Sequence, residues 1–245
     1  MAVRKSTKST RTKKEAPQTF WPKAFRFLMK AFLWFLGLSV FSVIVFKFIP
    51  VPFTPLMITR AIENKMDGKE MTSSHDWVPI EDISISMQKA VIASEDGSFL
   101  THNGFDFEAM QKAFKHNQKG KRIKGGSTIS QQTVKNVFLW QGRSYIRKGL
   151  EAYFTVLIEL IWGKERIMEV YLNSIEMGDG VYGIEAASQH WYRRSAKHLT
   201  PQQAAGIAAI LPNPRKFKAT NSSNFTNKRK GRILKVMRYI GKLEY

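Results

Sequence analysis

The sequence contains no cysteine, which excludes disulfide bonds, thiolate metal sites and a cysteine nucleophile. Acidic residues are also scarce: 19 Asp and Glu stand against 39 Lys and Arg, which leaves a formal net charge of +20. Such an excess predicts an anionic partner, either a nucleic acid, an acidic lipid or a phosphate-bearing substrate. With 245 residues, the chain has room for one ordinary domain and an appendage.

Long uncharged runs are absent except for one, Ala31 to Phe46, which reads AFLWFLGLSVFSVIVF. As a helix it covers about 24 Å at 1.5 Å per residue. Extended to residues 25–49 it spans a bilayer core of about 30 Å, because Lys30 and Lys47 can reach the headgroups. The run predicts a transmembrane anchor.

Residues 1–30 contain nine basic residues and one acidic residue, so the N-terminus is expected to stay in the cytoplasm. A cleaved signal peptide is the alternative, but it needs a small-residue cleavage site where this run ends in FIPVP. We therefore predict four parts. They are a basic cytoplasmic tail (1–24), a transmembrane anchor (25–49), a proline-rich stalk (50–58) and a folded domain (59–245).

Beyond Thr59 the apolar residues recur at helical spacing, and alternating strand patterns are short and few. Thr200, Pro201 and Gln203 predict a helix N-terminus with a capping box. The domain is expected to be mainly α.

Residues 95–104, EDGSFLTHNG, place Glu95 beside Asp96 at the end of an apolar helix. A carboxylate with a like charge next to it and partial burial is a candidate general base. The alternative is an acidic helix end that faces water.

Residues 125–136, GGSTISQQTVKN, predict a glycine-rich turn that enters a helix N-terminus, where free N–H groups attract anions. Thr128, Gln131, Gln132 and Lys135 share one helical face, which suits sugar hydroxyls beside a phosphate. The alternative is a capped helix with a solvated face. No P-loop is present, because the Gly-Lys-Ser/Thr triplet is missing.

Two further segments carry charge in an apolar setting. Arg147 and Lys148 open a helix, where cations gain nothing from the dipole, so a negative group is expected to hold them. Glu159 lies on the stripe that they begin and is expected to face solvent. In residues 164–173, KERIMEVYLN, Glu169 shares a face with Asn173 and offers a second carboxylate for glycosyl transfer.

Together and in this order, these segments resemble the family 51 glycosyltransferases, the peptidoglycan polymerases, from about residue 77 to residue 217. The fits are Glu-Asp-x-x-Phe-x-x-His-x-Gly at 95–104, Gly-Gly-Ser-Thr-Ile-x-Gln-Gln-x-x-Lys-Asn at 125–136, Arg-Lys-x-x-Glu at 147–151, the segment 164–173 with Met168 where Leu is usual, and GVYGIEAA at 180–187. The chain is most similar to members with one N-terminal anchor. Larger members add a transpeptidase domain, whose Lys-Thr-Gly motif is absent, so no transpeptidase activity is expected.

The resemblance implies a lysozyme-like, two-lobed, mainly α fold and polymerisation of lipid II into β-1,4 glycan strands with release of undecaprenyl pyrophosphate. It implies that Glu95 is the base, and that Lys135, Arg147 and Lys148 neutralise the leaving pyrophosphate. Glu169 supports the acceptor site or a divalent cation, Mg²⁺ or Mn²⁺, and no cofactor is required.

The remaining residues expected to bind substrate are Asp96, Phe99, His102, Ser127, Thr128, Gln131, Gln132, Asn136, Glu151 and Asn173. The expected location is the bacterial inner membrane, with a single-pass anchor and the catalytic domain outside the cytoplasm. Expected partners are lipid II, the growing glycan strand, the membrane and proteins of cell-wall synthesis or division, but no nucleic acid.

Two other classes of function are weighed against this one. A membrane-anchored lytic glycosidase of lysozyme-like fold also uses a Glu in a sugar groove. Hydrolytic or lytic chemistry, however, requires neither a membrane anchor nor a cluster of cations around the site. A nucleic-acid or membrane-binding protein without enzymatic activity explains the charge and little else.

Phe107, Met110 and Phe114 form one apolar helical face, edged by lysines such as Lys112. This pattern is typical of a helix that lies in the headgroup region of an anionic bilayer. The alternative is that these side chains pack into the core. A substrate whose lipid tail stays in the bilayer favours the membrane.

Overall fold

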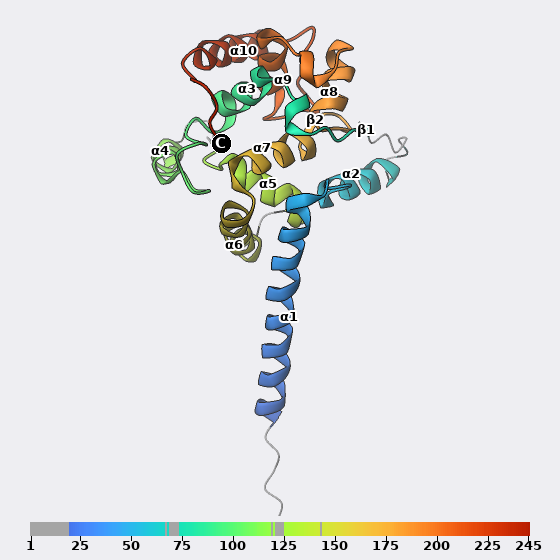
Figure 1. Ribbon diagram of the computed structural model, residues 1–245, viewed down its shortest axis with the longest axis vertical. Coiled ribbons are helices and arrows are strands. Elements are labelled where there is room, and N and C mark those ends of the chain that lie inside the picture. The colour runs from blue at the N-terminus through green and yellow to red at the C-terminus, as the bar shows by residue number, and fades with distance from the viewer. Residues whose placement is uncertain (1–19, 67, 69–73, 119, 121–124, 143) are drawn as a thin grey trace, which may run out of the picture. The chain divides into compact units, whose positions relative to one another are not determined.

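Helices dominate the computed structural model, which describes residues 20–66, 68, 74–118, 120, 125–142 and 144–245 (Figure 1). The predicted mainly α fold is confirmed. The helices of the described residues are α1 (Phe20–Phe48), α2 (Pro55–Met66), α3 (Ile85–Glu95), α4 (Phe107–Gln118), α5 (Ile129–Phe138), α6 (Tyr145–Ile161), α7 (Gly163–Ser174), α8 (Ile184–Tyr192), α9 (Pro201–Ile210) and α10 (Asn224–Met237), with 3₁₀ turns η1 (Ile80–Asp82) and η2 (Ala196–His198).

Side-chain caps fix where several helices begin. The capping box predicted at Thr200 is present, with Gln203 as its partner, and Pro201 occupies the first turn of α9. A second box opens α5, where Thr128 and Gln131 cap each other's backbone N–H groups. Each cap satisfies donors that the first helical turn leaves unpaired, and a cap of this kind stabilises a helix by about 1 kcal/mol.

A small sheet joins distant parts of the chain. Its strand order is β1-β3-β2, with β1 (Ser74–His75) parallel to β3 (Val181–Tyr182) and β2 (Glu176–Gly178) antiparallel to it. Gly183 follows β3 with φ of 78°, and a Cβ there would lie 2.8 Å from the Asn173 carbonyl oxygen. Only glycine fits this turn, which leads directly into α8.

The core lies among α3, α5, α7 and α9. Every residue of α9 from Ala204 to Ile210 is buried, and small alanines let this helix pack closely against both α3 and α10. Met87 of α3 and Ile167 of α7 are fully buried in the same cluster. Truncating such a side chain to alanine costs about 2–5 kcal/mol, so this layer sets the position of the α3 C-terminus.

The last turns of α1 belong to the folded unit that runs from Ser42 to Tyr245. Val43 is fully buried, and the Trp162 indole N–H donates to its carbonyl oxygen at 2.7 Å. The Arg166 guanidinium donates to the carbonyl oxygens of Phe46 at 2.9 Å and Ile49 at 2.6 Å. The two Arg166 bonds engage carbonyl groups at the end of α1, where the last turn of a helix leaves carbonyl groups free.

The boundaries of the predicted stalk differ from the structure. Val51 and Thr54 are buried, and α2 begins at Pro55, inside residues 50–58. The prolines favoured an extended spacer, yet Pro55 takes the first position of a helix, where its missing N–H costs nothing. Thr54 caps that helix by accepting from the Met57 N–H at 3.3 Å. The segment therefore packs on the domain.

Candidate active site

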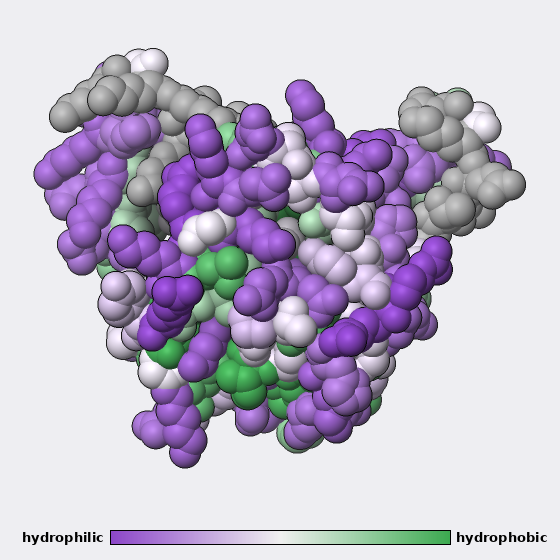
Figure 2. Space-filling model, turned by 90° about the horizontal axis from the view of Figure 1, so that it is seen from above, coloured by the Kyte–Doolittle hydropathy of each residue, from purple (hydrophilic) through white to green (hydrophobic). Residues whose placement is uncertain are grey.

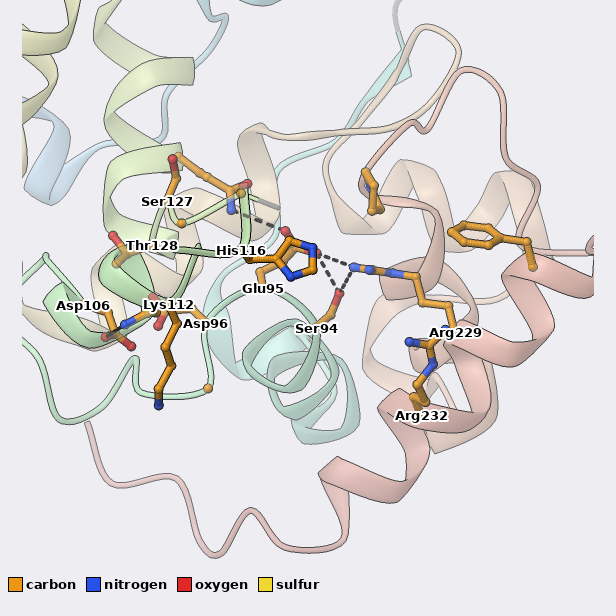
Figure 3. Close-up of a pocket in the computed structure, with 17 residues that line it drawn as sticks. Ser94, Glu95, Asp96, Asp106, Lys112, His116, Ser127, Thr128, Arg229 and Arg232 are labelled. Atoms are coloured by element: carbon orange, nitrogen blue, oxygen red, sulfur yellow. Dashed lines mark hydrogen bonds and ion pairs between the residues drawn. The ribbon is translucent and has the colours of Figure 1, made fainter. Parts of the chain in front are cut away.

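A cavity of about 670 Å³ opens where α3 ends and α5 begins (Figure 3). Its walls come from α3, α4, the loop before α5, and α10. The polar and charged residues that line it are Ser94, Glu95, Asp96, Asp106, Lys112, His116, Ser127, Thr128, Gln132, Arg229 and Arg232. Five of the residues predicted from sequence are among them: Glu95, Asp96, Ser127, Thr128 and Gln132.

Glu95 is the last residue of α3, and its side chain is 15% exposed. One carboxylate oxygen, Oε1, accepts from the Ser94 hydroxyl at 2.7 Å and from Arg229 Nη2 at 3.0 Å. Gln132 Nε2 lies 3.4 Å from the other oxygen, Oε2. The carboxylate is thus held inside the cavity, and the alternative of an acidic helix end that only faces water does not fit this geometry.

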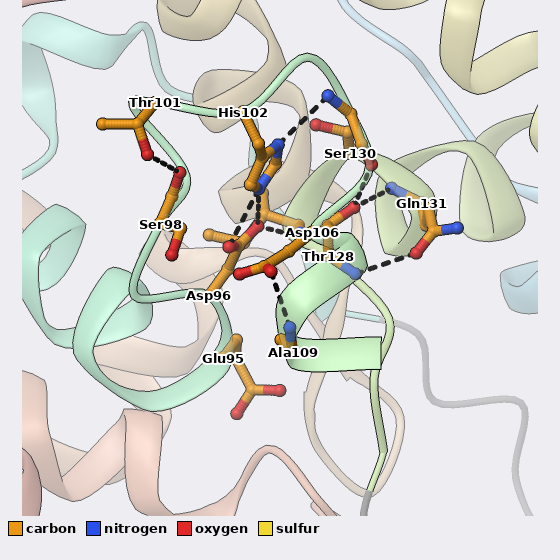
Figure 4. A network of polar contacts seen from close by, with 12 residues as sticks. Glu95, Asp96, Ser98, Thr101, His102, Asp106, Ala109, Thr128, Ser130 and Gln131 are labelled. Atoms are coloured by element: carbon orange, nitrogen blue, oxygen red, sulfur yellow. Dashed lines mark hydrogen bonds and ion pairs between the residues drawn. The ribbon is translucent and has the colours of Figure 1, made fainter. Parts of the chain in front are cut away.

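Asp96 and His102 form a buried network that shapes the loop after α3 (Figure 4). His102 Nε2 lies 2.9 and 3.0 Å from the two Asp96 oxygens, and His102 Nδ1 accepts from the Gly104 N–H at 3.1 Å. Asp96 also accepts from the backbone N–H of Ile129 at 2.9 Å. The pair therefore ties the loop to the first turn of α5 and places Glu95 next to that turn.

The shared polar face predicted for α5 is only partly available to a ligand. Thr128 and Gln131 are each 2% exposed, because the capping box uses both side chains, and Thr128 also donates to the Gly104 carbonyl at 2.7 Å. Gln132 remains at the cavity, where the Tyr171 hydroxyl lies 3.4 Å from its Oε1. Spacing alone could not show that the first residue of the face serves as the cap.

Lys135 lies outside the cavity lining and interacts electrostatically with the charged group at the start of α6 and, more weakly, with Glu95. Burial lowers the pKa of Lys135, and the positive charges of Arg147 and Lys148 lower it further. The carboxylates of Glu151 and, more weakly, Glu95 oppose this shift. Arg147 pairs with Glu151 at 3.1 Å, and Lys148 pairs with the other oxygen of that carboxylate. Glu151 is therefore the negative group expected to hold the two cations. Three cations and two carboxylates share this neighbourhood.

Comparison with known proteins assigns this arrangement to a family. The family model described as Transglycosylase matches residues 63–238. The chain belongs to the transglycosylase family. A Bdellovibrio bacteriovorus protein named biosynthetic peptidoglycan transglycosylase is 55% identical over 215 residues, which cover 87% of this chain and 86% of the relative. Proteins of the same name from Caulobacter vibrioides (53%, covering 85% and 89%) and Pseudomonas syringae pv. syringae (50%, covering 90% and 93%) are also similar.

Membership in the transglycosylase family supports the predicted lysozyme-like fold. Within that fold, the expectation that Glu159 faces solvent is wrong. Its side chain is 9% exposed, accepts from the Ser130 hydroxyl and pairs with Lys164 at 2.8 Å. The α6 stripe faces α5 rather than water, because Glu151 and Thr155 on the same stripe are also buried.

Glu169 lies in a different environment from the cavity. It pairs with Arg166 at 2.6 Å, burial raises its pKa, and the other groups that act on it are Glu81, Trp77 and Glu165. None of these residues lines the cavity. Among the described residues, no group of three or more His, Asp or Glu side chains is arranged to hold a metal. The assignment of Glu169 to the acceptor site or to a divalent cation therefore stays a prediction.

Three other predicted residues of this transglycosylase domain are buried. Asn173 is fully buried, accepts from the Val78 N–H at 3.0 Å and donates to the Val78 carbonyl at 2.8 Å. Phe99 is fully buried, with Lys164 Nζ 4.7 Å from its ring centre, and Asn136 is 6% exposed. None of the three lines the cavity, and their binding of substrate stays a prediction.

Sequence reasoning missed the basic side of the cavity. Arg229 and Arg232 come from α10, and Lys112 and His116 come from α4. Each lies in a lysine-rich or arginine-rich stretch, where no pattern separates a site residue from a solvated charge. Asp106 was also missed. It accepts from the Ala109 N–H at 2.7 Å, a bond that lowers its pKa and caps α4.

Proposed function

We propose that this chain is a peptidoglycan glycosyltransferase that polymerises lipid II into β-1,4 glycan strands and releases undecaprenyl pyrophosphate. The observation that carries this proposal is a carboxylate, Glu95, held by Ser94 and Arg229 in a cavity that the cations Lys112 and Arg232 also line. Family membership and the names of relatives at about 50% identity support the same reaction. A lytic glycosidase has no use for a cluster of cations beside its base.

The proposed reaction follows from these charges. Glu95 takes the proton of the acceptor sugar's 4-hydroxyl as that oxygen attacks the anomeric carbon of the growing strand. The new C–O bond forms with inversion as the bond to the pyrophosphate oxygen breaks. Lys135, Arg147 and Lys148 meet the charge that develops on the departing pyrophosphate, so a strong general acid is not needed. The proton stays on Glu95, and the lipid pyrophosphate leaves as an anion.

The decisive experiment is incubation of the detergent-solubilised full chain with lipid II. We expect long glycan polymer and no cleavage of preformed peptidoglycan. Cleavage without polymer formation would favour the lytic alternative. Labelling with a fluorescent penicillin is expected to be absent, because the sequence lacks the Lys-Thr-Gly of a transpeptidase site.

The pH dependence of the rate tests the role of Lys135. Because burial lowers its pKa from the usual 10.5, Lys135 loses its charge at a lower pH than an exposed lysine does. We expect the polymerisation rate to fall as the pH rises through this lowered value. Lys135→Arg should move the fall to higher pH, because a guanidinium keeps its proton. The control is Lys235→Arg at an exposed position, which should leave the pH profile of the rate unchanged. If Lys135→Arg also leaves the alkaline side of the profile unchanged, Lys135 does not have this role.

We further propose that α1 anchors the enzyme in the bacterial inner membrane. Among the described residues, one helix, Lys23–Phe48 within α1, is long and apolar enough to cross a membrane. The basic N-terminal residues favour an inside N-terminus and a catalytic domain outside the cytoplasm. A substrate carried on a lipid requires a site at the membrane, which supports the same location. Proteins of cell-wall synthesis or division remain predicted partners.

Topology is tested by protease accessibility in spheroplasts. Added protease is expected to digest the region after Pro55 and to spare an epitope at the N-terminus. The same protease added to inverted vesicles should give the opposite pattern and serves as the control. Protection of the domain in spheroplasts would place it in the cytoplasm, away from the proposed substrate.

We also propose that α4 contacts the lipid surface. Phe107 and Phe114 are 74% and 64% exposed, so the alternative that they pack in the core is wrong. The helix rests on the domain through Met110 and Ala113, which lie against Gly126. Of the basic residues around this helix, Lys112 is exposed, whereas Lys119, Lys121, Arg122 and Lys124 lie outside the described residues. Figure 2 shows a face of the protein on which hydrophilic residues surround a smaller hydrophobic patch.

Single-cysteine labelling tests this contact, because the natural chain has no cysteine. Phe107→Cys and Phe114→Cys, labelled with an environment-sensitive dye in anionic proteoliposomes, are expected to emit at shorter wavelength than the same dye at an exposed position away from α4. The control is Gln202→Cys on an exposed polar position of α9. If the dye emits at a wavelength typical of water at all three positions, α4 does not reach the lipid.

A further inference from the structure

The two oxygens of Glu95 have unequal environments. Oε1 lies 2.7 Å from the Ser94 hydroxyl and 3.0 Å from Arg229 Nη2. Arg229 Nη2 also lies 2.8 Å from the Ser94 hydroxyl oxygen, so the three groups form a closed triangle (Figure 3). Within the described part of the chain, Oε2 has only the 3.4 Å contact with Gln132 Nε2, at the edge of hydrogen-bonding distance. Oε2 is thus the oxygen that can take a proton.

The triangle joins two helices, and a further contact of Ser94 adds a third that packs against both. Ser94 and Glu95 end α3, and Arg229 projects from α10. The Ser94 hydroxyl also lies 3.2 Å from the Ala208 carbonyl of α9. Since α9 packs on both α3 and α10, this buried layer fixes where Arg229 stands. The orientation of Glu95 therefore depends on α10, a helix that contains none of the sequence motifs described above.

Arg229 is held in this position at a cost. Its side chain is 26% exposed, but its Nε atom is buried and has no hydrogen-bond partner among the described residues. A buried donor without a partner costs about 1–3 kcal/mol. A guanidinium in free solvent would avoid that cost. We infer that Arg229 is held here for its contact with the Glu95 carboxylate.

We propose that Arg229 is a positioning residue of the glycosyl transfer reaction. With Ser94 it fixes Oε1 and leaves Oε2 directed to the hydroxyl of the acceptor sugar. This inference rests on the proposed function, in which Glu95 is the base. A reacting group displaced by about 1 Å can lose about 10²-fold in rate, and two donors on one oxygen prevent such a displacement.

The competing assignment is that Arg229 binds a phosphate of the substrate directly. Both roles predict a loss of activity in Arg229→Ala, but they differ in the kinetic constant that changes. A positioning residue changes kcat and leaves KM nearly constant, whereas a ground-state substrate contact raises KM. They differ also in their dependence on Glu95, because only a positioning residue acts through that carboxylate.

The test uses the full chain in detergent with lipid II. For Arg229→Ala we expect kcat to fall by about 10- to 100-fold with KM within about twofold of wild type. Arg229→Lys, which keeps the cation, should recover part of the rate, whereas Arg229→Met should not. The matched control is Lys228→Ala, which removes the same charge from an exposed neighbouring position of α10 and should behave as wild type.

The double variant Glu95→Gln with Arg229→Ala gives the sharpest outcome. If Arg229 acts through Glu95, the second substitution adds less than about twofold to the loss caused by the first. A raised KM with unchanged kcat, or a full multiplicative loss in the double variant, would overturn the proposal. Thermal melting identifies unfolded variants, and if Arg229→Ala does not fold, Arg229→Met and Arg229→Lys decide by the same criteria. A wild-type chain that makes no polymer would overturn the proposed function itself.

Discussion

Glu95→Gln is expected to lower the rate of lipid II polymerisation by about 10²- to 10⁴-fold, the usual contribution of a general base. The amide has the same shape as the carboxylate, and its oxygen can still accept from Ser94 and Arg229. The fold should therefore persist, and only the ability to take a proton is lost. Initial rates of polymer formation and thermal melting of the same preparation measure the two effects separately.

The matched control for this variant is Glu165→Gln, which removes a carboxylate from an exposed position on α7 outside the cavity. It should polymerise at the wild-type rate. If Glu95→Gln keeps more than about a tenth of the wild-type rate, Glu95 is not the base.

Lys135→Ala is expected to cost about 10²- to 10³-fold in kcat, the range seen when one fixed group that stabilises a developing anion is removed. Arg147→Ala should act in the same direction, because its side chain is only 11% exposed. Lys148 is 50% exposed, so solvent screens its charge and Lys148→Ala should cost less. Initial rates with lipid II at saturating concentration measure this ranking.

Lys235→Ala is the control for these cations, since it removes one positive charge from an exposed position on α10. Lys112 is unsuitable for this purpose because it lines the cavity. Small and equal losses at Lys135, Arg147 and Lys235 would show that the basic residues act through net charge alone.

The features that sequence predicted well are local ones. The capping box at Thr200, the mainly α content and the position of Glu95 at the end of a helix depend on residues within one or two turns of each other. The pair formed by Arg147 and Lys148 with Glu151 was also predictable, because three and four residues along a helix bring side chains together.

The features that sequence missed are set by packing between distant segments. Arg229 is separated from Glu95 by 134 positions, and only the layer of α3, α9 and α10 brings them together. Glu169 had suitable chemistry and spacing, but the face of α7 that carries it and Arg166 lies near Glu81 and Trp77 rather than at the cavity. A helical wheel shows which residues share a face and does not show what that face meets.

The attachment of α1 to the domain has a consequence for release of the enzyme from the membrane. A protease that cut between Phe48 and Pro55 would leave the buried Trp162 indole without its acceptor, would take the Phe46 carbonyl away from Arg166 and would remove Val43 from the core. Each buried donor left unpaired costs about 1–3 kcal/mol, a large share of the stability of an ordinary domain. Shedding at this point would therefore inactivate the enzyme instead of freeing it, and a recombinant soluble form should begin no later than Ser42.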